Sequence, residues 1–334
     1  ANNVGVNIGA ASGSTSSGTF TLRGDTFASG AGNSIATNIR SANIVVEPSS
    51  GANFSAAQTY PFANFTMSSP ASLRIGKTTS TTQDVTLNSV SIAGPVSVYG
   101  KNVTLGGALT TTAAGDVQLV AGGGYVALNA NATVGGSGSV LMAKATDYIS
   151  TNASGTYKTN NGDMVFWADS DASSAGYVLL NNTVTLNTNS SGSGTGGNLW
   201  LAGGASDGST GLGRPSGYAT SSSSSYGGVQ FGTARNNFSV TTAGGNIVVK
   251  GQTTATGGYA GVAMWSGTAA APSTTQALID SGSGTINING NATVATEGAE
   301  IGWGGDGQTV IKSSSSTDPA ITVVGTSTTA TGLH

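Results

Sequence analysis

Short segments in which apolar and polar side chains alternate recur from one end of the chain to the other. Most begin with Asn or Asp, and stretches of Gly, Ser, Thr and Ala separate them. A period of two residues is typical of a β-strand that buries one face. The clearest segments are 43–46, 84–87, 102–105, 116–119, 163–166, 198–201 and 246–249. Outside residues 269–272, no stretch of ten or more residues has the apolar period of a helix, so the sequence predicts an all-β fold.

The spacing of these segments distinguishes between all-β architectures. Their first residues are at positions 84, 102 and 116 and then at 163, 198 and 246, so the later intervals are much wider than the earlier ones. Weaker strand-like segments inside the wide intervals are 125–128, 140–142 and 177–180. A propeller would repeat at about 40 residues, and a sandwich would end after about seven to nine strands. A β-solenoid with turns of roughly 20 residues or somewhat more tolerates corner loops of different lengths, and it is the architecture we predict.

The repetition is continuous and no linker stands out, so we expect residues 1–334 to form a single β-solenoid, as a whole subunit or as a segment of a longer chain. About 15 turns stacked at ~4.8 Å would make an elongated rod roughly 70 Å long. Ser and Gly concentrate at 190–197 and 203–228, which predicts loop excursions, either plain corner loops or projecting binding loops. Aromatic residues and a proline interrupt the pattern at 60–65, where we expect a further excursion.

The amino-acid composition indicates where the protein is located and which classes of partner it can have. Charged residues make up 7% of the chain, against roughly 25% in an average soluble domain, whereas hydrophobic residues reach 37% and sit in the alternating segments, so a core can form. The net charge of −3 and the absence of a basic patch exclude an electrostatic nucleic-acid partner. The chain has no cysteine and no apolar stretch near the ~20 residues of a transmembrane helix. This composition favours an extracellular protein of the bacterial cell surface.

Two stretches resemble the repetitive body of filamentous-haemagglutinin-type exoproteins. One comprises residues 72–77, 84–87, 90–100 and 102–105, and the other comprises 162–171 and 197–204. The resemblance implies a right-handed parallel β-helix, secreted across the outer membrane of a Gram-negative bacterium and used as a long adhesin or surface filament. The amino-terminal secretion domain of that family carries an Asn-Pro-Asn type motif, and this chain contains no Asn-Pro. The resemblance therefore implies that this chain is passenger body.

Asp163, Asp169 and Asp171 form the one local group of acidic residues that invites a chemical role. Three interpretations stay open. The carboxylates close a turn by hydrogen bonding to the backbone; Asp169 and Asp171 hold a calcium ion, although the loop lacks the full EF-hand pattern; or the group acts in catalysis, for which no neighbour is seen that would tune a pKa. Calcium is the one cofactor considered. The terminal His334 is expected to be poorly held, which argues against a Ser-His-Asp triad.

The tryptophans suggest carbohydrate contact, because exposed rings stack on sugars, although core packing is the commoner role. Trp167 and Trp200 lie in the segments that carry the family resemblance and are the candidates, and Trp265 and Trp303 also lie in or beside strands. The Gly-rich segment 302–307 lacks a following Gly-Lys-Ser/Thr, so we predict a turn there and no phosphate loop.

We expect a structural or adhesive module of a secreted filament, working by repetitive surface contact without catalysis. The competing hypotheses are a carbohydrate-active β-helix enzyme, a polysaccharide lyase or hydrolase, and an ice-binding protein, for which the Thr spacing is too irregular. Both ends of the chain, at 4–8 and 320–324, are strand-like and offer no capping helix. Because open strand edges pair with other chains, we expect like subunits or adjoining solenoid segments as partners, with host or surface glycans as further ligands.

Overall fold

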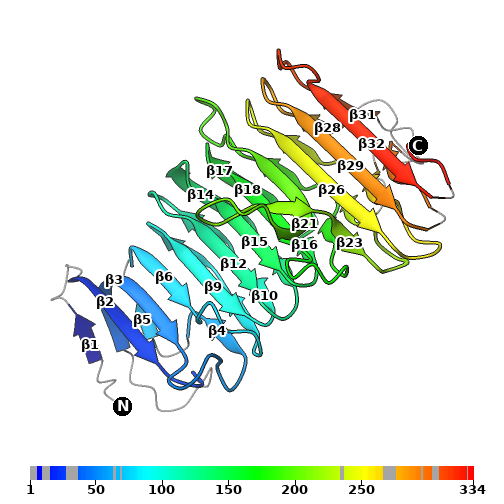
Figure 1. The fold of residues 1–334 in the computed structure, drawn as a ribbon. Helices are drawn as coiled ribbons and strands as arrows, with labels where there is room; N and C mark the ends of the chain where they lie inside the picture. The colour runs from blue at the N-terminus through cyan, green and yellow to red at the C-terminus, as the bar shows by residue number, and fades with distance from the viewer. Residues whose placement is uncertain are drawn as a thin grey trace.

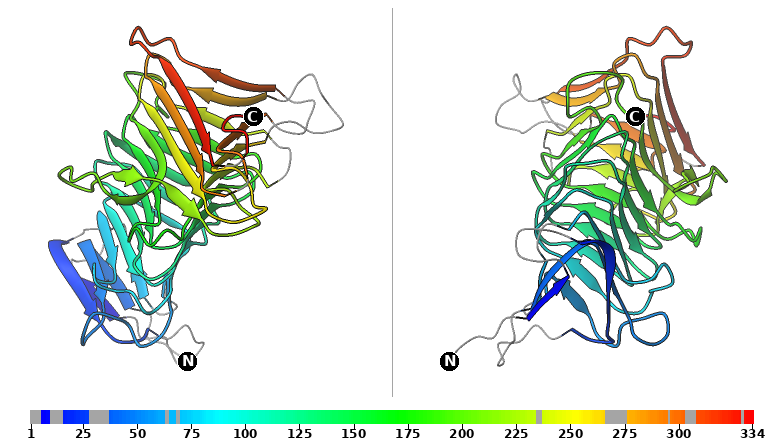
Figure 2. Two further views of the ribbon diagram at one scale, coloured as in Figure 1. Left: turned by 45° about the vertical axis from the view of Figure 1, so that its right-hand side comes forward. Right: turned by 90° about the vertical axis from the view of Figure 1, so that its left-hand side faces the viewer.

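The computed structural model describes residues 6–9, 16–27, 37–62, 65–67, 70–233, 237–265, 276–294, 296–302, 308–328 and 330–334. Within these residues the chain contains strands and turns, and it contains no helix. Three sheets run the length of an elongated body whose turns follow one another in sequence order, from β1 at one end to β32 at the other (Figures 1 and 2). The protein is a parallel β-helix, the β-solenoid predicted from its sequence.

One strand of each sheet, taken in turn, makes one turn of the solenoid, as β9, β10 and β11 do before β12 begins the next. The long sheet contains β1 (Val6–Gly9), β2 (Ser16–Arg23), β3 (Thr37–Glu47), β5 (Phe65–Met67), β6 (Ser72–Ile75), β9 (Val96–Gly100), β12 (Val117–Ala121), β15 (Leu141–Ala145), β18 (Met164–Ala168), β21 (Leu199–Ser206), β22 (Pro215–Gly217), β23 (Ala219–Ser221), β26 (Ile247–Thr253), β29 (Ile286–Ala292) and β32 (Ile321–Ser327). The second sheet contains β4 (Gln58–Tyr60), β7 (Val85–Leu87), β10 (Val103–Leu105), β13 (Val126–Leu128), β16 (Ile149–Thr151), β19 (Val178–Leu180), β24 (Val229–Phe231), β27 (Val262–Met264) and β30 (Ala299–Ile301). The third sheet contains β8 (Val90–Ile92), β11 (Leu109–Thr111), β14 (Ala132–Ser137), β17 (Thr156–Asn160), β20 (Thr185–Asn187), β25 (Ser239–Thr241), β28 (Gln276–Asp280) and β31 (Gln308–Lys312).

The core is built from columns of apolar side chains that run along the rod. In the long sheet the in-register pairs make one continuous column of Val96, Val117, Leu141, Met164, Leu199, Ile247, Ile286 and Ile321. From Val96 to Ile286 every member of that column is at most 1% exposed. Each turn can bury its inward side chains only against the turns beside it, which is why the alternating pattern recurs along the whole chain.

The predicted number of turns is wrong. Eleven long-sheet strands, from β2 through β32, follow one another along the described part of the rod, and this is fewer than the sequence spacing predicted. At ~4.8 Å per turn these strands span roughly 48 Å. The predicted turn length holds in the middle of the rod, where Val96 pairs with Val117 of the next turn, but Leu199 pairs with Ile247, which is more than twice as far along the chain. Inserted corner loops lengthen the chain between stacked strands without adding turns to the solenoid.

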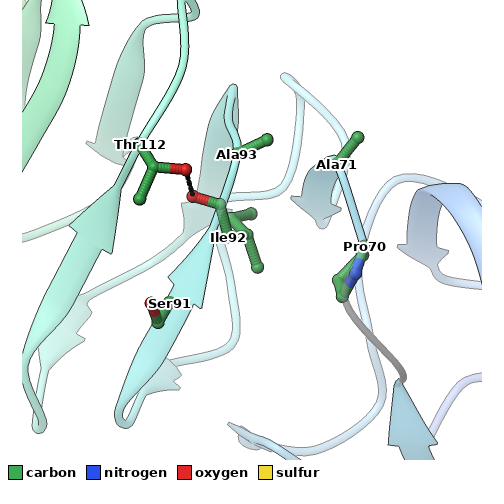
Figure 3. A pocket seen from close by; sticks show the side chains of 6 residues that line it. All are labelled: Pro70, Ala71, Ser91, Ile92, Ala93 and Thr112. Atoms are coloured by element: carbon green, nitrogen blue, oxygen red, sulfur yellow. Dashed lines mark hydrogen bonds between the residues drawn. The ribbon is translucent and has the colours of Figure 1, made fainter.

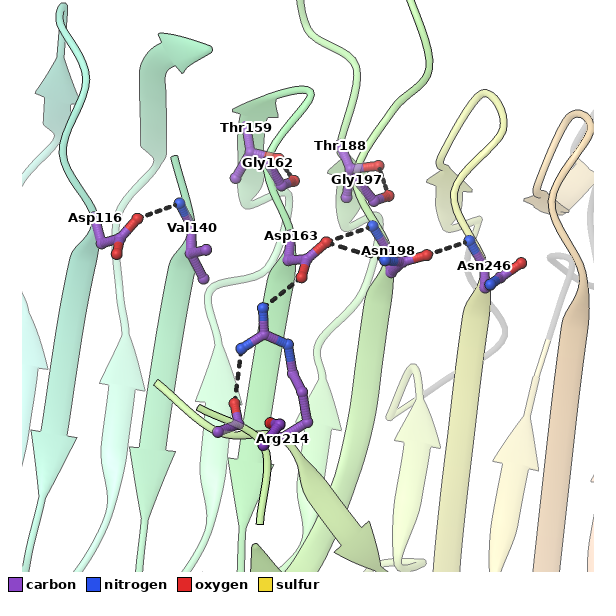
Figure 4. Close-up of polar contacts among 12 residues, drawn as sticks. Asp116, Val140, Thr159, Gly162, Asp163, Thr188, Gly197, Asn198, Arg214 and Asn246 are labelled. Carbon is purple, nitrogen blue, oxygen red and sulfur yellow. Dashed lines mark hydrogen bonds and ion pairs between the residues drawn. The ribbon is translucent and has the colours of Figure 1, made fainter. Parts of the chain in front are cut away.

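The hydrogen bonds made by Asp and Asn side chains explain why so many strands begin with these residues (Figure 4). At the corner that leads into the long sheet, the side-chain Oδ1 of four such residues accepts a hydrogen bond from a backbone N–H one turn further on, beginning with Asp116, which accepts from Val140 at 2.9 Å. Asp163 accepts from Asn198 at 2.8 Å, Asn198 accepts from Asn246 at 2.8 Å, and Asn246 accepts from Thr285 at 2.9 Å. These hydrogen bonds pair backbone N–H groups at the starts of the strands, which the hydrogen bonds of the sheet leave without an acceptor.

The predicted excursions have defined places. At 203–228, the chain leaves the long sheet after Gly203, forms an antiparallel pair between β21 and β22, and re-enters the sheet as β23 beside β26. At 60–65, Tyr60 ends β4, and the buried ring of Phe62 packs on Phe27 with 4.8 Å between ring centroids. Residues 4, 5, 63, 64, 269–272 and 303–307, on which parts of the predictions fall, lie outside the described residues.

Candidate functional surfaces

Asp163 does not form a cluster with Asp169 and Asp171, which corrects the sequence interpretation. Strand β18 lies between Asp163 and Asp169, and six extended residues at ~3.3 Å each place the two carboxylates roughly 20 Å apart. Asp163 lies at the corner that begins β18, where Oδ2 of its carboxylate forms an ion pair with the Arg214 guanidinium (Figure 4). The carboxylates therefore serve separate corners of one turn.

Asp169 closes the corner loop that follows β18. Its Oδ1 accepts hydrogen bonds from the backbone N–H of Ser174 at 3.0 Å and from the Ser173 hydroxyl at 3.2 Å, and its side chain is 2% exposed. Burial raises the pKa of Asp169 above its usual range, the hydrogen bonds oppose that rise, and the charge of Asp171 adds to it. These contacts are those of the hydrogen-bonded turn that was one of the three interpretations.

Two further carboxylates lie at this corner, those of the exposed Asp171 and of Asp147. Burial raises the pKa of Asp147, and the charge of Asp171 raises it further. Across the part of the chain that the structure describes, no three His, Cys, Asp or Glu side chains converge closely enough to hold a metal ion. Calcium at Asp169 and Asp171 stays a prediction.

Trp167 is packed in the interior, which is the commoner of the two roles that the sequence left open for it, and it offers no exposed ring to a sugar. Its side chain is 1% exposed, its indole Nε1 donates a hydrogen bond to the Gly204 carbonyl at 2.7 Å, and the Lys144 ammonium lies 3.9 Å from the ring centroid. Trp200 is half-buried, and the Arg214 guanidinium lies 4.9 Å from its ring centroid. Both indoles lie under or beside residues 204–218, which we call the flap.

The flap is held on the outer face of the long sheet by charge and by apolar contact. Arg214 joins it to Asp163 and to the Trp200 ring, and Leu212 packs against the cluster formed by Met142, Val165 and Trp167. The ion pair is partly buried, with side-chain exposures of 17% and 21%. A charged hydrogen bond with this degree of burial contributes more than an exposed surface pair.

Replacing Arg214 by alanine is expected to release the flap. The change removes the ion pair and the cation–π contact together, so the free energy of unfolding should fall by about 1.5–3 kcal/mol, and cleavage by protease within 207–213 should accelerate at least about tenfold. Limited proteolysis with mass spectrometry measures the second effect. Arg23→Ala is the matched control because Arg23 is 67% exposed in its pair with Glu47. Equal cleavage of the two variants would show that Arg214 does not hold the flap.

Four stacked tyrosines, which the sequence pattern did not predict, form a column at the corner that leads into the second sheet. Successive rings of Tyr125, Tyr148, Tyr177 and Tyr226 lie 4.9, 5.0 and 4.8 Å apart, with interplanar angles of 13°, 7° and 25°. Burial raises the pKa of Tyr148 and of Tyr177. The inner rings have both faces covered by neighbours, so the column fastens four turns together and leaves ring edges for contact.

The carboxyl-terminal end of the rod leaves apolar side chains exposed, with Ile321 on the inward face of its last strand and Val324 on the outer face. Among the described residues the large apolar side chains that are exposed are Ile321, Val324 and Leu333, at 38%, 41% and 50%. Ile321 and Val324 belong to β32, which pairs with β29 on one side and is the last strand of the long sheet. Residues 332–334 add to the second sheet, where the His334 N–H donates to the Ala299 carbonyl at 2.9 Å. The backbone of His334 is therefore held by the second sheet, and in this respect the expectation that His334 would be poorly held is wrong.

A cavity of about 320 Å³ lies beside β8 and is lined by Pro70, Ala71, Ser91, Ile92, Ala93 and Thr112 (Figure 3). None of these described lining residues is charged, and the Thr112 hydroxyl points to the Ile92 carbonyl at 3.5 Å. The lining offers neither an acid, a base nor a nucleophile paired with a base, so we assign it no chemistry.

Comparison with protein-family models, with curated proteins and with solved structures gives no significant match for this chain. The class of protein is therefore defined by its own fold, a parallel β-helix with an outer flap and an apolar carboxyl-terminal end. Among the described residues there is no helix that is long and apolar enough to cross a membrane.

Proposed function

We propose that this chain is a structural module of an extracellular filament on a bacterial surface, of the filamentous-haemagglutinin type that its strand pattern resembles. The observation that carries the proposal is the exposed apolar edge at β32. The core column that includes Val96 ends there with Ile321, which has a neighbouring turn on one side and solvent on the other. A further turn, from a like subunit or an adjoining solenoid segment, would cover it.

Two other features support repetitive contact rather than a single site. Charged residues make up 7% of the chain, so little repulsion opposes contact between rods. Hydrogen-bonded ladders and the tyrosine column repeat from turn to turn, which suits an extended surface. Asp163 lies apart from Asp169 and Asp171 and pairs with the flap, and Asp169 closes a corner turn, so the lyase or hydrolase hypothesis finds no support from these carboxylates.

Charging the carboxyl-terminal edge is expected to prevent end-to-end association. The wild-type chain should form larger species as its concentration rises into the micromolar range, and the variant Ile321→Lys, Val324→Lys should stay monomeric over the same range. Two lysines on this edge remove apolar burial and place two charges where the next turn would cover them without a counter-ion, so we expect association to weaken at least about tenfold. Sedimentation velocity measures the distribution, and electron microscopy shows whether the larger species are rods.

The matched control adds the same two charges away from the edge, as Asn129→Lys with Ser137→Lys, both exposed positions. This variant should associate as the wild type does. A wild-type chain that sediments as a monomer at every concentration tested would contradict the proposal, as would association that the edge lysines leave unchanged.

A further inference from the structure

A second cavity lies near the carboxyl-terminal end of the rod, beside β27 and β30. It has a volume of about 260 Å³ and is lined by Gly258, Tyr259, Trp265, Glu297, Glu300 and His334. The volume is several times the roughly 30 Å³ that one water molecule occupies in the liquid. Sequence analysis did not predict it, because its aromatic side chains come from 259–265 and its glutamates from 297–300, two segments that only the stacking of turns brings together.

Two aromatic rings form one corner of this cavity. Tyr259 and Trp265 meet edge to face, with ring centroids 4.6 Å apart and an interplanar angle of 69°. Trp265 is 5% exposed and is packed with Ala260 and Ala263, so its ring is fixed, whereas Tyr259 is half-buried. Aromatic faces carry negative electrostatic potential, which attracts a cation placed against them.

The glutamates supply negative charge that no ion pair within the described residues neutralises. Glu300 lies in β30 and is 8% exposed, and Glu297 is half-buried, its Oε2 accepting a hydrogen bond from the Thr296 hydroxyl at 3.2 Å. Neither carboxylate has an ion-pair partner among the described residues, where the ion-paired acids are Glu47, Asp163 and Asp280. Burial raises the pKa of Glu300, and the charge of Glu297 raises it further, whereas the Trp265 side chain lowers it by hydrogen bonding and the His334 charge lowers it too.

A buried carboxylate without a counter-ion is costly unless something supplies positive charge and hydrogen-bond donors. One indole N–H cannot satisfy a carboxylate that accepts up to about four hydrogen bonds. A primary ammonium group brings a positive charge and three donors, and its alkyl substituents fit against aromatic rings. A metal ion needs several converging ligands, and Glu297, Glu300 and His334, the metal-ligating side chains of the described lining, do not form such a group.

We propose that the cavity lined by Tyr259, Trp265, Glu297 and Glu300 binds the primary ammonium group of a small organic ligand. Glu300 is the principal acceptor, Glu297 the second acceptor at the more exposed side, and the Tyr259 and Trp265 rings form the apolar wall. An amino sugar and an alkylamine share this chemistry, and their relative affinities distinguish the two sources. The proposal does not rest on filament assembly.

The test is isothermal titration of the full chain with n-butylammonium and with glucosamine, using n-butanol and glucose as neutral counterparts. We expect saturable binding of one cation per chain and no measurable binding of the neutral compounds. Tighter binding of glucosamine would identify an amino-sugar site, and tighter binding of n-butylammonium an alkylamine site. Neutral compounds that bind as tightly as the cations, or cations that show no saturation up to about 10 mM, would overturn the proposal.

Glu300→Gln keeps the shape of the side chain and removes its charge. It should weaken cation binding at least about tenfold. The melting temperature should stay unchanged or rise, because the variant no longer buries a charge without a counter-ion. Asp318→Asn removes one exposed carboxylate elsewhere and is the charge-matched control. Cation binding that survives Glu300→Gln overturns the assignment. A lower melting temperature does so too, since it would mean that Glu300 already has a stabilising partner.

Discussion

Replacing Gly197 by alanine is expected to lower the free energy of unfolding by more than about 4 kcal/mol, the range of severe core changes. Gly197 lies at the corner that precedes β21, directly over Gly162 of the turn before it. A Cβ atom at Gly197 would come closer than 3.0 Å to the carbonyl carbon and oxygen of Gly162 and to the backbone nitrogen of Asp163. These are backbone atoms in a stacked corner, so they cannot move without separating the turns.

Urea unfolding followed by circular dichroism measures this loss. Gly192→Ala is the control in the same loop, because a Cβ atom there meets no atom within 4 Å. Its cost comes from the φ of +71° alone, about 1–2 kcal/mol for an alanine in the left-handed region. Equal losses for the two variants would mean that the corners do not pack as closely as the structure has them.

Phe166→Ala is expected to lower the free energy of unfolding by about 3–5 kcal/mol. Phe166 is fully buried in β18, between Ala143 on one side and Leu201 on the other, and its ring meets that of Tyr157 edge to face at 6.0 Å. Neighbours held in register by two parallel ladders cannot collapse into the space that the ring leaves, so the cavity persists.

The same urea titration serves for this variant. Phe166→Leu is the conservative counterpart and should cost less than about 1.5 kcal/mol, since it keeps most of the buried volume. A loss for Phe166→Ala below that of Phe166→Leu would contradict the packing described for this turn.

The alternating pattern was enough to predict an all-β solenoid, because most inward positions are apolar whichever sheet they belong to. It was not enough to count the turns. The Val-Thr-Leu of 85–87 lies in the second sheet, whereas the similar Val-Gln-Leu of 117–119 lies in the long sheet. Three alternating residues carry the same signal in every sheet, so the sequence does not tell which strands stack on which.

The sites were less predictable than the fold, for two reasons. Asp163 and Asp169 are close in sequence and distant in space, because an extended strand separates them. Tyr125 and Tyr148 are distant in sequence and stacked in space, because residues one turn apart become neighbours only when the register is known. The structured corner at Asp169 did carry a local signal, since Asp-Ser-Asp is a turn sequence.

All stacked strands of the rod run in the same direction, and this has a consequence for symmetry. A parallel sheet can be extended in parallel at the β32 edge only by a strand that offers the opposite edge, of the kind found at the amino-terminal end. Two identical ends therefore cannot meet and continue the sheet in the same sense. Contacts of this kind are head to tail, they do not close on themselves, and each added subunit presents the edge that the next one needs. An assembly built in this way is a polar polymer, with one growing end that differs chemically from the other.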